Sequence, residues 1–287
     1  MNKDFVKQLD PLPPNSKLII FGGGYSGQRI ASFARHLGAK VFCSRRNINS
    51  KGADFLFDTN KELSIEILEG ATHVLSSIPP LLSGEDPLLN KIKSKLENLK
   101  NLQWVGYLST TGVYGDTNGK WVNENTIPNP KQDRSIRRLS CEQEWQRTKI
   151  PLQILRLPGI YGPGRSAIDS LINGTSKMID KPGQVFSRIH VDDIAGAVLF
   201  LIKLYSQGNM PNIVNISDNL PTNNLEVNTF AAKLVNKSLP SKIPFEIATK
   251  TMSPMALSFW QENRRVDNSL LCKKLGYSLI HPDFKSG

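Results

Sequence analysis

Cysteine is scarce in this chain of 287 residues. The three that occur, Cys43, Cys141 and Cys272, are far apart and lack CxxC spacing. Their number and spacing exclude a disulfide scaffold and a zinc site, and they favour a reducing compartment. Long apolar runs are also missing, as is the charged-then-apolar order of a signal peptide. We therefore expect a soluble, cytoplasmic protein with no membrane partner and no bound metal.

Basic residues outnumber acidic ones, 36 to 25, which gives a formal net charge of +11. Such a balance favours anionic partners, for example phosphorylated cofactors, nucleotide-sugars or nucleic acid. The charges are scattered, however. Their densest stretch, Lys91–Lys100, has Ile92, Leu96 and Leu99 at helical spacing, so its lysines are interpreted as the solvated face of a helix.

Short apolar runs alternate with helical patterns along the chain. A proline-rich lead-in ends at Ser16, and a helix is predicted at Gln28–Leu37. Strand-like runs occupy Lys17–Phe21, Lys40–Ser44, Asp54–Phe57, Thr72–Ile78, Trp104–Ser109, Leu152–Leu157 and Ile213–Ile216, and Ile189–Leu204 is predicted as a strand end that runs into a helix. Strands separated by helices predict an α/β fold, a Rossmann-type doubly wound parallel sheet.

Glycines follow the first predicted strand in the spacing Gly22-x-Gly24-x-x-Gly27. In a dinucleotide-binding site the first glycine allows a tight turn and the second lets the backbone approach the pyrophosphate. The third allows close packing of the helix on the strand. The helix N-terminus, here Tyr25, Ser26 and Gln28, faces the anion. The alternative is a plain glycine-rich turn.

The end of the second predicted strand indicates which dinucleotide binds. An NAD enzyme offers a carboxylate there to the ribose hydroxyls, whereas this chain has Cys43-Ser44-Arg45-Arg46. A hydroxyl and two guanidinium groups suit the 2′-phosphate of NADP. The alternative is a pair of solvated arginines. Asp58, after the third strand, is either an acceptor for the adenine amino group or a helix N-cap.

Several segments from about residue 17 to the C-terminus resemble the extended branch of the short-chain dehydrogenase/reductase superfamily, which holds nucleotide-sugar epimerases, dehydratases and reductases. Besides the glycine motif, the segments that carry this resemblance are Leu108–Asp116, Leu155–Gly164, Ile189–Ala195, Val214–Asp218, Asn263–Asn268 and Leu275–Tyr277. The resemblance implies that Thr110 hydrogen-bonds the reacting oxygen. It also implies that Ser77, Ile78 and Ser109 contribute to the cofactor site.

The family's Tyr-x-x-x-Lys pair lies eight and four residues before a glutamate, which here corresponds to Glu142. Those positions hold Arg134 and Arg138, so the chain resembles an atypical, epimerase-like subgroup that lacks the catalytic pair. Arginine does not exchange protons near neutral pH and can only stabilise negative charge. The alternative pairs Arg138 with Glu142 on the surface and leaves Arg134 in solvent. Tyr161 is the remaining candidate acid or base, with a structural turn as its alternative.

The resemblance also implies a division into lobes. An N-terminal extension, 1–16, precedes a nucleotide-binding domain over 17–165, completed by 190–219. A substrate-binding lobe comprises 166–189 and 220–287. The expected protein is an NADP-dependent oxidoreductase or epimerase-like enzyme, monomeric or homodimeric, that acts on an anionic small molecule such as a nucleotide-sugar. NAD is the less favoured cofactor. The alternatives are a non-catalytic NADP(H)-binding sensor or scaffold and an RNA-binding protein, although nucleic acid is the less favoured partner.

Overall fold

The computed structural model describes residues 11–208 and 210–287, and most of the predicted extension, 1–16, lies outside this range. The chain divides into two compact units. The first consists of the chain up to Thr110 together with Asp133–Arg156 and Val191–Val214, and the second of Thr111–Gln132, Leu157–His190 and Asn215–Gly287. The units therefore interleave along the chain more than the predicted lobes do, because Thr111–Gln132 belongs to the second unit.

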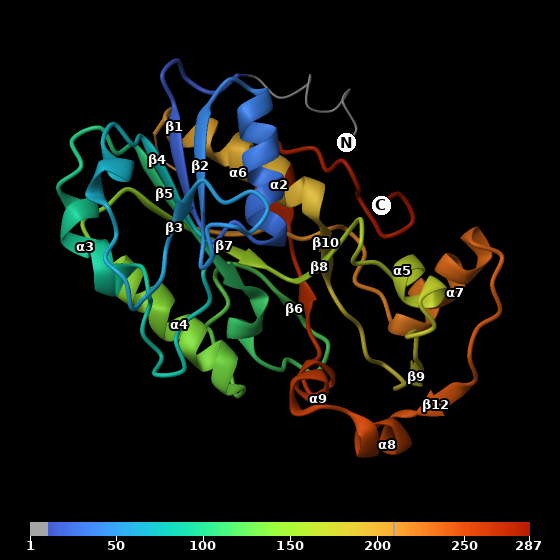
Figure 1. The fold of residues 1–287 in the computed structure, drawn as a ribbon. Coiled ribbons are helices and arrows are strands. Elements are labelled where there is room, and N and C mark those ends of the chain that lie inside the picture. The colour runs from blue at the N-terminus through green and yellow to red at the C-terminus, as the bar shows by residue number, and fades with distance from the viewer. Residues whose placement is uncertain (1–10, 209) are drawn as a thin grey trace. The chain divides into compact units, whose positions relative to one another are not determined.

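A seven-stranded sheet forms the centre of the first unit, in the order β11-β7-β5-β4-β1-β2-β3 (Figure 1). Its strands are β1 (Lys17–Phe21), β2 (Lys40–Arg45), β3 (Phe55–Leu56), β4 (His73–Ser76), β5 (Trp104–Thr110), β7 (Leu152–Leu157) and β11 (Ile213–Asn215). The pairs β1–β2, β1–β4, β4–β5 and β2–β3 are parallel. The strand order reverses at β1, as the predicted doubly wound fold requires.

Helices cover both faces of this sheet. They are α2 (Tyr25–His36), α3 (Leu89–Glu97), α4 (Asp133–Gln146) and α6 (Val191–Tyr205), with the short 3-10 helix η1 (Ile65–Leu68). Side chains alternate along a strand, so Ile19 and Phe21 of β1 join the core cluster that includes residues of α3 and α4. Ile20 points the other way, toward Gly27 of α2, and α2 packs along α6 (Figure 1).

The predicted elements of the first unit are observed with shifts of a few residues at their ends. α2 begins at Tyr25 rather than Gln28, and the lysine-rich helix is α3, with Leu89, Ile92 and Leu96 buried. The buried strand β7 has the predicted bounds, Leu152–Leu157. No helix of the described residues has the length and apolar character needed to cross a membrane.

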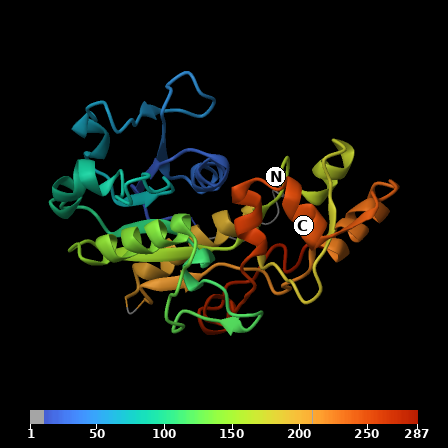
Figure 2. The same cartoon turned by 90° about the horizontal axis from the view of Figure 1, so that it is seen from below.

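The second unit consists of short elements. Its strands pair in parallel as β8 (Gly159–Tyr161) with β10 (Arg188–His190), β9 (Met178–Asp180) with β12 (Lys242–Pro244), and β6 (Trp121–Val122) with β13 (Arg265–Val266). Its helices are α5 (Ala167–Ile172), α7 (Asn224–Leu234), α8 (Phe245–Ala248), α9 (Pro254–Trp260) and the single turns η2 (Thr111–Tyr114), η3 (Thr249–Thr251) and η4 (Leu270–Lys274). The paired helices α5 and α7 lie beside each other in both views (Figures 1 and 2).

Candidate functional site

The glycine turn joins β1 to α2, and its three motif glycines have different surroundings. Gly22 has a φ of +96°, and a Cβ there would lie 2.5 Å from Ser77 Oγ. A Cβ on Gly27 would lie 2.4 Å from the carbonyl oxygen of Gly22, so helix and turn are in close contact. A Cβ on Gly24 would meet no heavy atom within 4 Å. The turn thus combines tight packing at two glycines with open space at the third.

The first turn of α2 has no side-chain cap. Gly24 is the N-cap residue, and no side-chain hydrogen bond is made at this position. The first N–H groups of a helix have no partner inside the helix, and together with the helix dipole they attract anions. Tyr25 and Ser26, both at least partly exposed, lie on this turn. The open space at Gly24 and the uncapped helix end can together accept a phosphate group.

The end of β2 supports the glycine turn. Ser44 is buried, and its Oγ accepts the N–H of Gly22 at 3.0 Å, while its carbonyl oxygen accepts the N–H of Gly23 at 2.8 Å. Arg45 is partly buried and Arg46 is exposed. The hydroxyl of Ser44 therefore fixes the turn, and the two guanidinium groups follow directly on the chain.

The end of β4 supports the same turn from its other side. Ser77 donates its hydroxyl to the carbonyl oxygen of Gly22 at 2.5 Å, and its N–H donates to Phe21 O at 2.8 Å. Asp58 lies after β3, where its Oδ1 accepts the N–H of Asn60 at 2.9 Å. The next helix, η1, has Ser64 as its N-cap. Asp58 thus closes a local turn and does not cap this helix.

Arg138 lies on α4 and donates to three acceptors at the ends of β4 and β5. Its Nη1 is 3.0 Å from Tyr107 Oη and 3.2 Å from the carbonyl oxygens of Ile78 and Leu108. Burial raises the pKa of Tyr107 well above its usual value, although the positive charge of Arg138 opposes that shift. Tyr107 therefore stays protonated at neutral pH. Arg134 lies one turn earlier on α4 and is partly exposed.

Glu142 lies four residues after Arg138 on α4. The two do not form the surface pair that was the alternative interpretation of the sequence. Glu142 and Arg156 of β7 are 1% and 2% exposed. The Glu142 carboxylate accepts from Arg156 Nη2 at 2.6 Å and from Nε at 3.1 Å. The Ser109 hydroxyl also donates to Glu142 Oε1. Ser109 is therefore buried and engaged, and Thr110, partly exposed, is the next residue of β5.

This buried pair was not predicted from the sequence. Glu142 served only as a landmark for counting, and the resemblance grouped Arg156 with arginines that border a substrate lobe and could hold a diphosphate. A charged residue inside a strand that is buried on both faces needs a partner. Arg156 in Leu152–Leu157 was thus the signal that could have revealed the pair. Burial raises the pKa of the Cys43 thiol to about 11 and that of the Cys141 thiol to about 12, so both thiols stay protonated at neutral pH.

Tyr161 belongs to the second unit, at the end of β8. Its hydroxyl donates to the carbonyl oxygen of Asp283 at 3.1 Å, and its ring packs edge-on against His190 with centroids 5.1 Å apart. Tyr114 is buried in the same unit and donates to Asn215 Oδ1 at 2.8 Å. Both tyrosines therefore hold turns of the second unit together.

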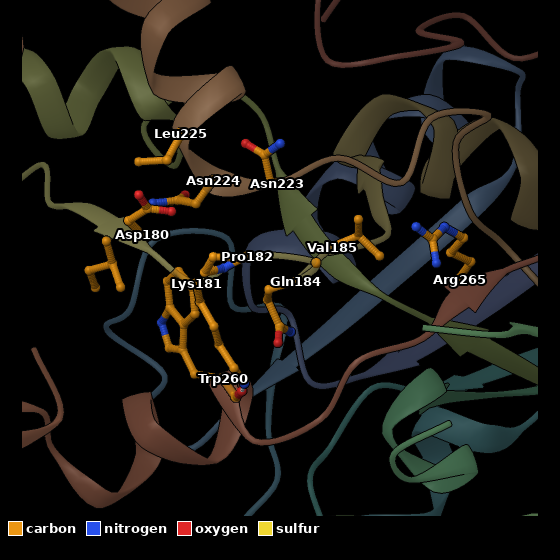
Figure 3. Close-up of a pocket in the computed structure, with 12 residues that line it drawn as sticks. Asp180, Lys181, Pro182, Gln184, Val185, Asn223, Asn224, Leu225, Trp260 and Arg265 are labelled. Atoms are coloured by element: carbon orange, nitrogen blue, oxygen red, sulfur yellow. Dashed lines mark hydrogen bonds between the residues drawn. The ribbon is translucent and has the colours of Figure 1, made fainter. Parts of the chain in front are cut away.

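A pocket of about 180 Å³ lies in the second unit (Figure 3). Asn223 and Asn224 come from the start of α7, and Trp260 from the end of α9. Lys181 donates to the carbonyl oxygen of Trp260, and its Nζ lies 4.6 Å from the centre of the Phe245 ring. Burial lowers the pKa of Lys181, while Asp116 opposes the shift. The pocket thus combines amides, an indole and a cation.

Arginines on the neighbouring segments of the second unit donate hydrogen bonds to protein groups. Arg188 donates to the carbonyl oxygens of Phe186 at 2.9 Å and Thr222 at 2.8 Å. Arg264 donates to Gly115 O at 2.8 Å and pairs with Glu262 at 2.7 Å, and Arg265 donates to Gly119 O. These guanidinium groups hold loops of the second unit in place, and Arg265, which lines the pocket, is thereby oriented.

No family model matches the chain, and no curated protein matches it. Solved structures do. A conserved protein of unknown function from Silicibacter pomeroyi DSS is 37% identical, with 95% of this chain and 96% of that chain covered and a TM-score of 0.85. A protein from Methylobacillus flagellatus, assigned as an NAD-dependent epimerase/dehydratase, is 25% identical, with coverages of 95% and 96% and a TM-score of 0.73.

Human epimerase family protein SDR39U1, solved with NADPH, also shares the fold. It is 14% identical, with 94% of this chain and 97% of that chain covered and a TM-score of 0.73. The similarity thus extends over nearly the whole chain, in agreement with the strand order and the glycine turn. The chain belongs to the extended short-chain dehydrogenase/reductase superfamily, among its epimerase/dehydratase-like proteins.

Proposed function

We propose that the first unit binds NADP(H) in preference to NAD(H). The observation that carries this proposal is the Ser44-Arg45-Arg46 run at the end of β2, beside the glycine turn and without a carboxylate. Arg45 Nε is buried and has no hydrogen-bond partner among the described residues, and Arg46 is exposed. A 2′-phosphate would accept from both guanidinium groups. The NADPH in the human neighbour supports this choice.

The remaining cofactor contacts follow from the turn. Gly24 and the N–H groups of Tyr25, Ser26 and Gly27 would hold the pyrophosphate, because only Gly24 leaves space above the helix end. Ser44, Ser77 and Ser109 contribute by holding the turn and the strand ends that surround it. Ile78 and Arg138 would border the nicotinamide, since Ile78 follows β4 and Arg138 of α4 donates to its carbonyl oxygen.

Calorimetric titration of the protein with NADPH and NADH tests the preference. We expect NADPH to bind at least about tenfold more tightly, which corresponds to roughly 1.4 kcal/mol. Arg45→Asp should reduce or invert the difference, because it removes a cation and supplies the carboxylate typical of NAD enzymes. Equal affinities for the two dinucleotides in the unmodified protein would contradict the proposal.

We further propose that the protein is an oxidoreductase or epimerase-like enzyme that acts on an anionic small molecule such as a nucleotide-sugar. The nicotinamide supplies hydride transfer when bound. Thr110 would hydrogen-bond the reacting oxygen, and Arg138 would keep positive charge at the strand ends without exchanging a proton. The neighbour MoeE5, 17% identical and solved with UDP-glucose and NAD, supports this substrate class, as does the pocket with Lys181.

A non-catalytic NADP(H) sensor is the second candidate, because Arg134 and Arg138 would occupy the positions of the family's catalytic tyrosine and lysine. The contacts of Arg138 favour it, since all three acceptors of its Nη1 are protein groups. A library of nucleotide-sugars and sugar phosphates, with NADPH fluorescence as the readout, separates the candidates. Oxidation of NADPH, reduction of NADP+ or formation of an epimer with any member supports the enzyme, and none of the three across the library supports the sensor.

A further inference from the structure

The loop between β2 and β3 carries positive charge beside the glycine turn. Arg45 precedes it, and Arg46 and Lys51 lie on it, with no acidic residue before Asp54. Two internal turns shape the loop, since Ser50 N–H donates to Asn47 O at 3.1 Å and Ala53 N–H donates to Ser50 O at 3.0 Å.

Asp54 closes the base of this loop. Its Oδ2 accepts the N–H of Cys43 at 2.8 Å and the guanidinium of Arg35 at 2.7 Å. The loop therefore has a defined conformation at its base, and Gly52, two residues before Asp54, has a separate contact.

Gln28 of α2 provides that contact. Its Nε2 donates to the carbonyl oxygen of Gly52 at 2.6 Å. The amide is closely enclosed, because a Cβ on Gly23 would lie 2.8 Å from Nε2 and a Cβ on Gly52 would lie 2.3 Å from Oε1. Gly52 also has a φ of +76°, which a residue with a Cβ rarely adopts. Gln28 thus fastens the loop at Gly52 to the helix that follows the glycine turn.

The fastened loop in turn contacts Arg45. Arg45 Nη2 lies 3.4 Å from the carbonyl oxygen of Lys51, the residue next to Gly52. Its Nε is buried and without a hydrogen-bond partner in the described part of the chain. One edge of the guanidinium is therefore held by the loop backbone, which orients the Arg45 side chain.

We infer that Gln28 is a positioning residue for recognition of the 2′-phosphate, and this inference rests on the proposed binding of NADP(H). By fixing Gly52, Gln28 fixes the adjacent Lys51 carbonyl and, through it, Arg45. The entropic cost of ordering the loop is then incurred when the chain folds and not when the dinucleotide binds. NAD(H) has no 2′-phosphate, so its affinity does not depend on this arrangement. Gln28 thereby sets the choice between the two dinucleotides without contacting the phosphate itself.

Gln28→Met tests the inference, because methionine keeps the length of the side chain and removes the amide without adding charge. Dissociation constants for NADPH and NADH would be measured by calorimetry on the full chain. Loss of one neutral hydrogen bond predicts about three- to tenfold weaker NADPH binding, with NADH binding changed less than about twofold. A variant in which both affinities fall equally, or in which neither changes, overturns the inference.

Gly52→Ala is the second variant, and Gly38→Ala is its matched control. Gly52 and Gly38 both have positive φ, but a Cβ on Gly38 would meet nothing within 4 Å. Both variants strain the backbone, and only Gly52→Ala displaces Gln28. We expect the NADPH-to-NADH selectivity to fall in Gly52→Ala and to stay unchanged in Gly38→Ala. Equal effects of the two substitutions would contradict the inference even if Gln28→Met fails to fold.

The NADPH and NADH affinities of the unmodified protein distinguish this inference from the NADP(H) proposal on which it rests. If it binds NADPH and NADH equally, the NADP(H) proposal fails and the inference fails with it. If it prefers NADPH and Gln28→Met retains the full preference, only the role of Gln28 is wrong. In the combined Gln28→Ala, Gly52→Ala variant the steric conflict is absent, so the two losses of selectivity should not add.

Discussion

Gly24 and Gly27 lie in the same turn, yet an added methyl group would have opposite consequences at the two residues. At Gly27 it would collide with the carbonyl oxygen of Gly22, and at Gly24 it would enter open space. Gly24 has a φ of −74°, which any residue adopts. No packing contact in the described protein therefore requires glycine at this position, and the space is available to a ligand.

Gly24→Val should consequently keep the fold and lose dinucleotide binding, whereas Gly27→Ala should destabilise the first unit. Overpacking of this kind typically lowers the free energy of unfolding by about 1–3 kcal/mol. Calorimetry with NADPH and chemical denaturation measure the two effects on each variant. A folded Gly24→Val protein with undiminished NADPH binding would show that the motif is only a turn.

Arg138 and Tyr107 are hydrogen-bonded to each other, and neither is suited to proton transfer. Arginine keeps its charge at all physiological pH values. Tyr107, the acceptor of its hydrogen bond, has a pKa raised well above the usual value by burial. Neither residue exchanges protons near pH 7, so the pair can supply charge and position only. Any proton in a reaction here must come from another group, such as a water or the substrate.

At the scale of secondary-structure elements, the Glu142–Arg156 pair joins α4 to β7, and Ser109 adds β5 to the same contact. Both charges are removed from water, so each depends on the other. The contact fixes the helix that carries Arg134 and Arg138 against the strand that leads to Thr110.

Glu142→Gln should lower the free energy of unfolding by about 3–5 kcal/mol, because it leaves the Arg156 guanidinium buried without a counter-charge. Chemical denaturation followed by circular dichroism measures the change. The double variant Glu142→Leu, Arg156→Met removes both charges and should recover most of the loss. If Glu142→Gln is as stable as the unmodified protein, the Glu142 carboxylate does not stabilise the buried Arg156 guanidinium.

The elements were predictable because each leaves a periodic pattern in its own residues. β7 was predicted with its observed bounds, and α3 from the spacing of Ile92 and Leu96. The contacts that complete the site join residues distant in sequence, such as Gln28 with Gly52 and Arg138 with Ile78. A side chain's partner across such a gap depends on rotamer and packing, which no local pattern records.

At the scale of the whole molecule, the excess of positive charge concerns stability as well as binding. With a net charge of +11 at pH 7, acidification adds further positive charge, and self-repulsion opposes the compact state. His73 makes a contribution of its own to the loss of stability on acidification. It lies on β4, between β1 and β5, and is 2% exposed, with Nδ1 2.8 Å from Thr72 Oγ1.

Burial lowers the pKa of His73 from 6.5 to about 4. The unfolded chain therefore binds a proton below pH 6.5 that the folded protein does not accept until about pH 4. Stability is complete above pH 6.5 and is lost as the pH falls through this window. Between pH 7 and pH 5 the free energy of unfolding should fall by about 2 kcal/mol through this residue.

Denaturation curves at pH 7 and pH 5 for two histidine variants separate this contribution from the general charge effect. His73→Gln removes the buried imidazole, and His36→Gln removes an exposed one at the end of α2. We expect the loss of stability on acidification to shrink by about 2 kcal/mol in His73→Gln and to stay near its original size in His36→Gln. If both variants lose as much stability as the unmodified protein, the acid sensitivity arises from net charge, and the buried imidazole has no part in it.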